Sequence, residues 1–149
     1  SYRGRVERIV WSAAPDDLLL HGLIDVGAAV DDWEEWMLRI LDVPAALSAR
    51  GYNGHAEGEL LLKLDDSVLS KNNGQWKLTV ADGKGFVAQT NDDCTGNIRL
   101  SSNSLAAVYS GYMSPSTARR MRRIVADDQQ VAAMTSIFSS GYPYFSDRF

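Results

Sequence analysis

The sequence predicts an α+β fold, in which helices pack on one face of a mostly antiparallel sheet of roughly five strands. Three observations predict this class. Apolar and polar residues alternate through the middle of the 149-residue chain, tight-turn signals separate the alternating segments, and capped helical segments fill the last third. About 45% of the residues are hydrophobic, which is enough to build one core.

The N-terminal segment predicts a strand and a short helix. As a strand, YRGRVERIVW would place on one face Val6, Arg8 and Val10 and on the other Arg5, Glu7, Ile9 and Trp11, which we interpret as a strand at an exposed sheet edge. Pro15 and Asp16 then precede an apolar run, which predicts a short helix around 18–23. Because an unpaired strand edge tends to find a partner, this segment also supports the hypothesis of an assembly module.

The pattern over 36–42 fits both a helical stripe and a strand. As a strand, it would carry on one face Trp36, Leu38 and Ile40. Pro44 disfavours a helix that runs up to the residue before it. Pro44 also suits the first position of a helix, and Gly51 suits the position just past its end. We therefore expect a strand over 36–42 and a helix over 44–50.

The middle of the chain predicts four more strands. Apolar residues alternate in HAEGELLLKLDD and in NNGQWKLTV. Their shared faces are predicted to carry Leu60, Leu62, Leu64, Trp76, Leu78 and Val80. Asp82 and Gly83 are a strong signal for a tight hairpin turn. GFVAQT then returns as a strand, and GNIRLSS makes one more short strand.

Two helices are predicted next. SSNSLAAVYSGY has Ser101 or Ser102 as its N-cap and Gly111 as its stop. SPSTARRMRRIVA opens with Ser114 as N-cap and Pro115 in the first turn.

The second of these helices carries an arginine cluster, which we weighed as a phosphate-binding patch against a solvated helix face. The cluster comprises Arg119, Arg120, Arg122 and Arg123. The net charge of −4 and the lack of interleaved aromatic residues favour the solvated face, with Met121, Ile124 and Val125 turned inward. An acidic surface elsewhere in the same polypeptide stays an alternative partner for these arginines.

The last predicted helix leads into an aromatic C-terminal segment. DDQQVAAMTSIFSSG opens with a capping box of Asp127 and Gln130 and ends at Gly141. Its apolar stripe consists of Val131, Met134, Ile137 and Phe138. The aromatic residues that follow predict a packed tail, and they are Tyr142, Tyr144, Phe145 and Phe149. Either this tail only covers the core, or the packed ring of Phe149 fixes the α-carboxylate as a proton acceptor.

Several classes of function find no support in the residues. His21 and His55 are far apart and have no metal-ligand spacing, so no metal site is predicted. The paired aspartates fall at turns and caps, where Asp makes local hydrogen bonds. No P-loop, dinucleotide fingerprint or nucleophile motif appears. The single cysteine, Cys94, allows no intrachain disulfide and suits a reducing cytoplasm.

The net charge and the hydropathy of the chain bear on two expectations: which partners it binds and where in the cell it is found. The acidic balance argues against nucleic acid or an anionic membrane as the main partner. No apolar run approaches the ~18 residues of a membrane span, and we expect a cytoplasmic protein. The chain lacks Met at its start and begins almost inside an alternating segment, which indicates a piece of a longer protein.

Several motifs occur together in the order of one known family. They are Arg-x-x-Asp-Val-Pro-Ala-Ala-Leu over 39–47, Asn-Asn-Gly-x-Trp over 72–76, Leu-Ala-Ala-x-Tyr-x-Gly-Tyr over 105–112 and a closing Phe149. Together they resemble the C-terminal, sterol-carrier-protein-2-like (SCP2-like) part of the Eis-type (enhanced intracellular survival) GNAT N-acetyltransferases. Residues 31–149 resemble this SCP2-like domain, and residues 1–30 look like the end of the family's middle GNAT-like domain.

The resemblance implies a three-part acetyltransferase of which this chain is the last part. An N-terminal GNAT domain of the same polypeptide would bind acetyl-CoA, and the terminal carboxylate, here on Phe149, would act as general base on an amine substrate. The general-acid tyrosine and the acetyl-CoA loop belong to the N-terminal domain, so this chain alone is expected to bind no cofactor and to be inactive. A homo-oligomer is expected. Arg148 would repel a polycationic aminoglycoside.

Two other functions stay open at this stage. The first is a stand-alone lipid- or sterol-binding module, which would need an open apolar tunnel in the core. The second is an assembly domain without a site of its own.

Overall fold

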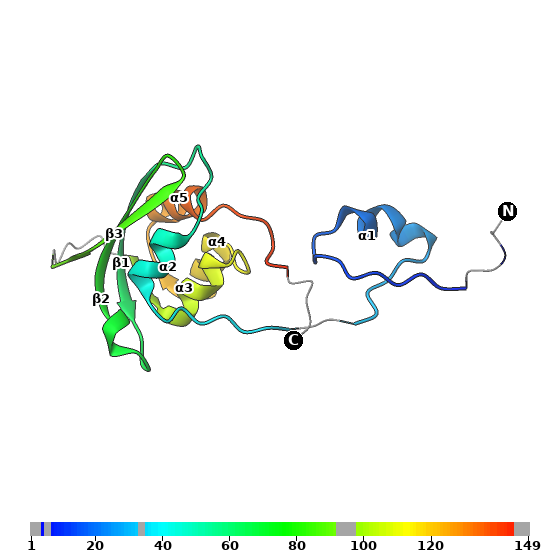
Figure 1. Cartoon of the computed structure of the whole chain (residues 1–149), viewed down its shortest axis with the longest axis horizontal. Helices are drawn as coiled ribbons and strands as arrows, with labels where there is room; N and C mark the ends of the chain where they lie inside the picture. The colour runs from blue at the N-terminus through cyan, green and yellow to red at the C-terminus, as the bar shows by residue number, and fades with distance from the viewer. Residues whose placement is uncertain (1–3, 5–6, 33–34, 92–97, 145–149) are drawn as a thin grey trace. The chain divides into compact units, whose positions relative to one another are not determined.

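The computed structural model describes residues 4, 7–32, 35–91 and 98–144, and the chain divides into two compact units (Figure 1). Unit 1 comprises Ser1–Glu35 and Tyr142–Phe149, and unit 2 comprises Trp36–Gly141. Cys94 lies outside the described residues. The division into a GNAT-like tail and an SCP2-like domain, placed between residues 30 and 31, stays a prediction.

Unit 1 contains two short helical turns in its N-terminal part. Helix α1 (Leu18–Leu23) begins after Asp17, whose carboxylate accepts a hydrogen bond from the Leu19 amide at 2.7 Å. The 3₁₀ turn η1 (Ile24–Val26) follows directly. The helix predicted around 18–23 is thus confirmed. The strand predicted over 5–11 is wrong for its described part, because residues 7–11 pair with none of the described strands.

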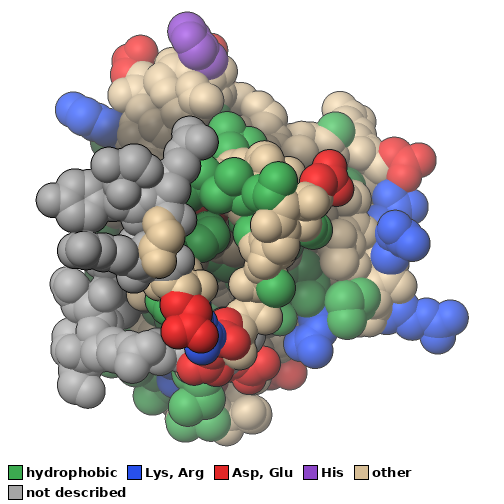
Figure 2. Space-filling model, turned by 90° about the vertical axis from the view of Figure 1, so that its right-hand side faces the viewer, with side chains coloured by type: hydrophobic (Ala, Val, Ile, Leu, Met, Phe, Trp, Pro, Cys, Tyr) green, Lys and Arg blue, Asp and Glu red, His purple; other side chains and the backbone are tan. Residues whose placement is uncertain are grey.

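Hydrophobic side chains in unit 1 are largely uncovered. None of its described residues is buried, and large apolar side chains stay exposed at Ile9, Val10, Leu18, Ile24 and Val26. Exposed hydrophobic side chains are visible on the face that Figure 2 draws. An alternating sequence forms a strand only where another strand supplies hydrogen bonds, and no described residue of unit 1 does so.

Unit 2 is built on a five-stranded sheet in the order β3-β2-β1-β4-β5. The strands are β1 (Gly58–Asp65), β2 (Gly74–Ala81), β3 (Lys84–Thr90), β4 (Ile98–Ser101) and β5 (Ile124–Val125). Strands β1 and β4 are parallel, and the other three neighbouring pairs are antiparallel. The predicted α+β class, with a mostly antiparallel five-stranded sheet, is confirmed.

Four helices lie on one side of this sheet (Figure 1). They are α2 (Val43–Ala49), α3 (Ser102–Tyr109), α4 (Pro115–Arg120) and α5 (Asp128–Ile137). The core lies between sheet and helices. From the strands it takes the alternating residues that the sequence predicted, Leu60, Leu62, Leu64, Trp76, Leu78 and Val80, and from the helices Leu47, Leu105, Met134 and Ile137.

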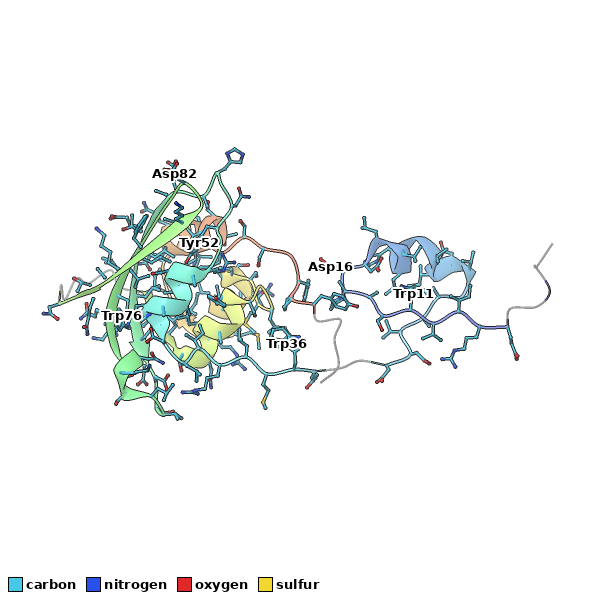
Figure 3. The ribbon with its side chains drawn as sticks, viewed as in Figure 1. Trp11, Asp16, Trp36, Tyr52, Trp76 and Asp82 are labelled. Carbon is cyan, nitrogen blue, oxygen red and sulfur yellow. The ribbon has the colours of Figure 1, made fainter. Side chains whose placement is uncertain are left out.

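The hairpin between β2 and β3 has the tight turn that the sequence predicts. Asp82 and Gly83 both take positive φ, 51° and 72°, between the paired residues Ala81 and Lys84. This backbone twist matches the twist of the two strands. Asp82 stands at the tip of the hairpin in Figure 3.

One strand of the sheet is not the one predicted. Residues 36–42 form no strand, and the fifth strand is β5, which pairs with β4. The predicted pattern put apolar residues on one strand face over 36–42. In the structure Trp36 and Leu38 of that face are 48% and 41% exposed, whereas Ile40 is buried, and the main chain of this segment is held by side chains, as described below.

The helix predicted from Ser114 onward ends early. Helix α4 stops at Arg120, and Arg122 takes φ 56°, which the right-handed helix does not allow. Ile124 is therefore buried as a strand residue paired with Leu100. Met121 and Val125 are exposed, so the prediction that they turn inward is wrong.

Candidate functional site

The predicted site residue, Phe149, lies outside the described residues. The structure does describe the helix that leads to it and the point where the chain leaves that helix. Tyr142 and Tyr144, in the described part of the tail, are 52% and 43% exposed, so the prediction of a packed tail is wrong for these two rings. The candidate site is therefore built from α5 and the residues that hold its end.

Helix α5 is fixed at its start by the predicted capping box. The Asp127 carboxylate accepts a hydrogen bond from the Gln130 amide, and the Gln130 side chain accepts one from the Asp127 amide, both at 2.8 Å. The helix then buries Met134, Ile137 and Phe138, where its C-terminal end meets the core. The tail thus leaves from a well-anchored element.

Arg50 joins the C-terminal ends of three helices. It follows α2, and its Nε donates to the carbonyl of Tyr109 at the end of α3 at 3.1 Å. Its Nη2 donates to the carbonyl of Phe138 at the end of α5 at 3.5 Å, and Nη1 donates to Gly51 at 3.2 Å. Helix C-termini carry partial negative charge, so one permanent cation stabilises three of them.

Three aromatic rings surround the same guanidinium group. Its central carbon lies 5.1 Å from the ring centre of Tyr52, 5.7 Å from that of Tyr109 and 5.4 Å from that of Phe138. These distances are within the range of cation–π attraction. Tyr52, which is labelled in Figure 3, also donates a hydrogen bond from its hydroxyl to the Leu47 carbonyl at 2.7 Å. The sequence analysis did not single out Arg50, because its partners are up to 88 positions away.

The first tail residues also press against the end of α3. Gly111 takes φ 83° just after that helix. A Cβ at this position would lie 2.3 Å from Oγ of Ser140 and 2.6 Å from the carbonyl oxygen of Gly141. Only glycine allows this approach, so Gly111 is both the stop that the sequence predicts and a packing surface for residues 140–141.

A second cluster joins two of the sequence motifs around a buried carboxylate. Asp66 is 3% exposed, and its Oδ1 accepts hydrogen bonds from the Val68 and Leu69 amides at 2.9 Å and from Nη2 of Arg39 at 2.6 Å. Its Oδ2 accepts one from Nδ2 of Asn72 at 3.0 Å. The hydrogen bonds from the Leu69 amide, the Asn72 side chain and the Val68 amide, named from the largest effect to the smallest, hold the pKa of Asp66 well below its usual value.

Asn72 extends the cluster to α2 and β2. It is 1% exposed, its Oδ1 accepts a hydrogen bond from the Val43 amide at 3.2 Å, and its Nδ2 also donates to the Ile40 carbonyl at 3.3 Å. Its own carbonyl accepts one from Nε1 of Trp76 at 3.0 Å. Trp76 is labelled on β2 in Figure 3. The Asn-Asn-Gly-x-Trp motif is thus a structural connection that holds residues 40–43.

The other predicted candidates are dispersed. All four residues of the arginine cluster are exposed, as a solvated face requires, and Arg119 pairs with the exposed Asp128. His21 lies in α1 and His55 in a loop of unit 2. Among the described residues, no group of three or more His, Cys, Asp or Glu side chains is placed to hold a metal ion. No helix in the described ranges has the length and hydropathy to span a membrane.

Two open hollows occur on the surface. One, of about 570 Å³, lies in unit 1 between residues 7–11 and 19–28 and is mainly apolar. The other, of about 150 Å³, lies in unit 2 and is lined by Asn53, His55, Ala56, Ser136 and Ser139. Of these lining residues only Ala56 belongs to the core. Neither hollow provides an apolar tunnel between sheet and helices.

The sheet covered on one face by four helices defines an SCP2-like domain. Residues 43–146 match the family model described as the sterol carrier protein domain. The chain belongs to this family.

Its relatives include acetyltransferases. It is 33% identical over 142 residues to N-acetyltransferase Eis of Mycobacterium tuberculosis, covering 93% of this chain and 33% of that protein. The crystal structure of a GCN5-related N-acetyltransferase from Kribbella flavida superimposes with a TM-score of 0.73 at 29% identity, over 92% of this chain and 35% of that one. The crystal structure of a GCN5-related N-acetyltransferase from Anabaena variabilis superimposes with a TM-score of 0.66 at 32% identity, over 70% of this chain and 26% of that one.

The similarity makes this an acetyltransferase-related SCP2-like domain. The chain spans about a third of the length of the curated relatives that it matches.

Proposed function

We propose that this chain is the C-terminal domain of an acetyl-CoA-dependent N-acetyltransferase and that the terminal carboxylate, on Phe149, is the general base of the full-length enzyme. The observation that carries the proposal is the 33% identity to Eis across 93% of this chain, in which the domain occurs as part of an acetyltransferase. The partners in this proposal are the preceding GNAT domains of the same polypeptide, which would bind acetyl-CoA, and an amine substrate.

The chemistry needs a proton acceptor near the amine. An amine attacks the acetyl carbonyl only as the free base, so a positioned carboxylate that accepts the ammonium proton speeds the reaction. The nitrogen then forms its bond to the acetyl carbon while the bond from carbon to the sulfur of coenzyme A breaks. The role of this chain is to hold that carboxylate at the end of a segment that begins on α5.

The side-chain carboxylates with shifted pKa values are poor alternatives within the described part of unit 2. The Ala45 amide lowers the pKa of Asp42, and the hydrogen bond from Lys77 lowers that of Glu59. The pKa of Asp66 is lowered too. A lowered pKa weakens a carboxylate as a base at neutral pH. None of these three carboxylates is the base in this proposal, which assigns the task to the chain terminus.

The test is an extension of one glycine after Phe149 in the full-length enzyme, whose intact mass first verifies the terminus. Moving the carboxylate by one residue should lower kcat by about 100-fold or more, with the KM for acetyl-CoA unchanged. The matched control is Phe149→Tyr, which keeps an aromatic ring and the terminal carboxylate and should retain most of kcat. An extended enzyme with wild-type kcat would show that the carboxylate is not the base.

The lipid-carrier and assembly hypotheses are tested on the same protein. Native mass spectrometry that finds a co-purified acyl ligand would favour the carrier, although the two hollows described above offer it no apolar tunnel. Light scattering measures the predicted homo-oligomer, and a monomer would argue against both the oligomer and the assembly role.

A further inference from the structure

We infer that Arg50 is a positioning residue for the C-terminal segment: its guanidinium fixes the point at which residues 139–149 leave α5, and with it the reach of the carboxylate on Phe149. The inference rests on the proposed function for its effect on catalysis. The anchoring itself does not depend on that function, and it is tested separately below.

The charge of Arg50 is directed at backbone carbonyls. None of the described ion pairs includes it, and its group is half-buried. Three N–H groups point instead to the carbonyls of Gly51, Tyr109 and Phe138. Phe138 is the last residue before the chain leaves α5, so this contact acts at the base of the tail.

The base of the tail, residues 138–141, is held from two directions. On one side the Phe138 ring lies against the guanidinium at 5.4 Å. On the other side Ser140 and Gly141 lie against Gly111, which follows the helix whose last carbonyl, on Tyr109, also binds Arg50. The end of α3 and the base of the tail are therefore fixed to the same cation.

Lysine can replace only part of this group. Arginine presents five N–H donors in a rigid planar fork and stacks on aromatic faces, whereas lysine is a compact point charge. Three acceptors in three different elements, with three rings around them, match the fork.

The base of the tail is close in sequence to the terminal carboxylate. The terminal carboxylate lies eleven residues beyond Phe138, and such a segment spans at most about 40 Å when it is fully extended. Since a misplacement of about 1 Å can cost about 100-fold in rate, a loosened base should be visible in turnover.

The experiment uses the full-length enzyme with Arg50→Met, Arg50→Lys and the control Arg120→Met, which removes an exposed arginine in the last turn of α4. Steady-state kinetics gives kcat and the KM for acetyl-CoA, and the pH profile of kcat reports the base. Hydrogen exchange of the amides over 139–144 reports the anchor independently of activity.

We expect Arg50→Met to lower kcat at least about tenfold with the KM for acetyl-CoA within about twofold of wild type. In this variant the acid limb of the pH profile of kcat should shift, and the amides over 139–144 should exchange their hydrogens faster than in wild type. Arg50→Lys should fall between Arg50→Met and wild type, and Arg120→Met should match wild type in every measurement.

The outcomes separate this inference from the proposed function. Wild-type exchange over 139–144 in Arg50→Met would overturn the anchor. A kcat loss that only follows the folded fraction, with an unchanged pH profile, would overturn the positioning role, because that describes general destabilisation. If the glycine extension leaves kcat intact while Arg50→Met speeds exchange, the anchor is upheld and the base role fails. If the extension lowers kcat and Arg50→Met does not, the positioning role fails alone.

Discussion

Nη2 of Arg39 lies 2.6 Å from Oδ1 of Asp66, across 27 positions of sequence. The Asp66 side chain is 1% exposed, and that of Arg39 is 35% exposed. The pair fastens the segment before α2 to the connection between β1 and β2. This explains how residues 36–42 keep an ordered path without a neighbouring strand, and it gives the buried carboxylate the donors that a buried charge requires.

Asp66→Asn should make the protein less stable at neutral pH, and the effect should fade in acid. Because the folded-state pKa of Asp66 is lowered, its contribution is present above the unfolded value of 3.8. It is lost as pH falls below that value through the folded pKa. Urea midpoints of wild type and variant should therefore converge at low pH. Asp65→Asn, at the exposed neighbouring position, should match wild type throughout. Equal midpoints for Asp66→Asn at neutral pH would contradict this reading.

Asn72→Ala should cost about 2 kcal/mol or more of unfolding free energy. The change leaves the Val43 amide and the Ile40 carbonyl without the partners they have in the core, and an unsatisfied buried polar group costs about 1–3 kcal/mol. Urea unfolding followed by circular dichroism measures it. Asn53→Ala, at an exposed loop position, is the control and should stay within about 0.5 kcal/mol of wild type. A similarly small change at Asn72 would mean that the network rearranges freely.

The central strands and most helix starts could be predicted because their signals are local. Along β1 and β2 apolar residues recur at every second position, and the face that they form is buried, as the pattern requires. Side-chain caps at Asp127 and Ser114 are read within four residues. The hairpin turn at Asp82 and Gly83 is equally local. Such features depend on backbone sterics and short-range hydrogen bonds, which the sequence shows directly.

The parts that could not be predicted depend on distant partners. Residues 36–42 have a pattern that fits a strand, yet Asp66 and Asn72 hold this segment and no strand pairs with it. Strand β5 is two residues long. Its sequence continues the helical pattern that begins at Ser114, and only the positive φ of Arg122 in the structure shows that the helix has ended. Arg50 looked like an ordinary helix-end residue. The motif over 72–76 was visible in the sequence. That its Asn72 holds residues 40–43 by hydrogen bonds could be seen only in the fold.

Gly85→Ala should destabilise the contact of α2 with β3. A Cβ there would lie 2.6 Å from the Leu47 carbonyl oxygen and 2.7 Å from the Tyr52 ring, so helix and strand would have to separate. Overpacking of this kind costs about 1–3 kcal/mol. Gly54→Ala is the matched control, because nothing lies within 4 Å of its Cβ position. Thermal unfolding of the two variants measures the difference, and equal melting temperatures would show that the two elements separate at no cost.

Tyr52→Phe should remove one buried hydrogen bond and one abnormal titration. The lost bond from the hydroxyl to the Leu47 carbonyl should cost about 1 kcal/mol. Burial raises the pKa of Tyr52 from 10.0 to about 12, so its contribution is present below 10.0. It is lost as pH rises from there to about 12, because the unfolded phenol ionises first.

Urea midpoints of wild type and Tyr52→Phe should therefore differ at about pH 8 and move closer at about pH 11. Phenolate absorbance of the folded wild type should include a tyrosine that ionises late, and Tyr52→Phe should lack it. Tyr112→Phe is the control: Tyr112 is 63% exposed, so its loss should leave both the midpoint and the late titration unchanged. If the late titration persists in Tyr52→Phe, another tyrosine is the buried one and the hydroxyl of Tyr52 is not held at the end of α2.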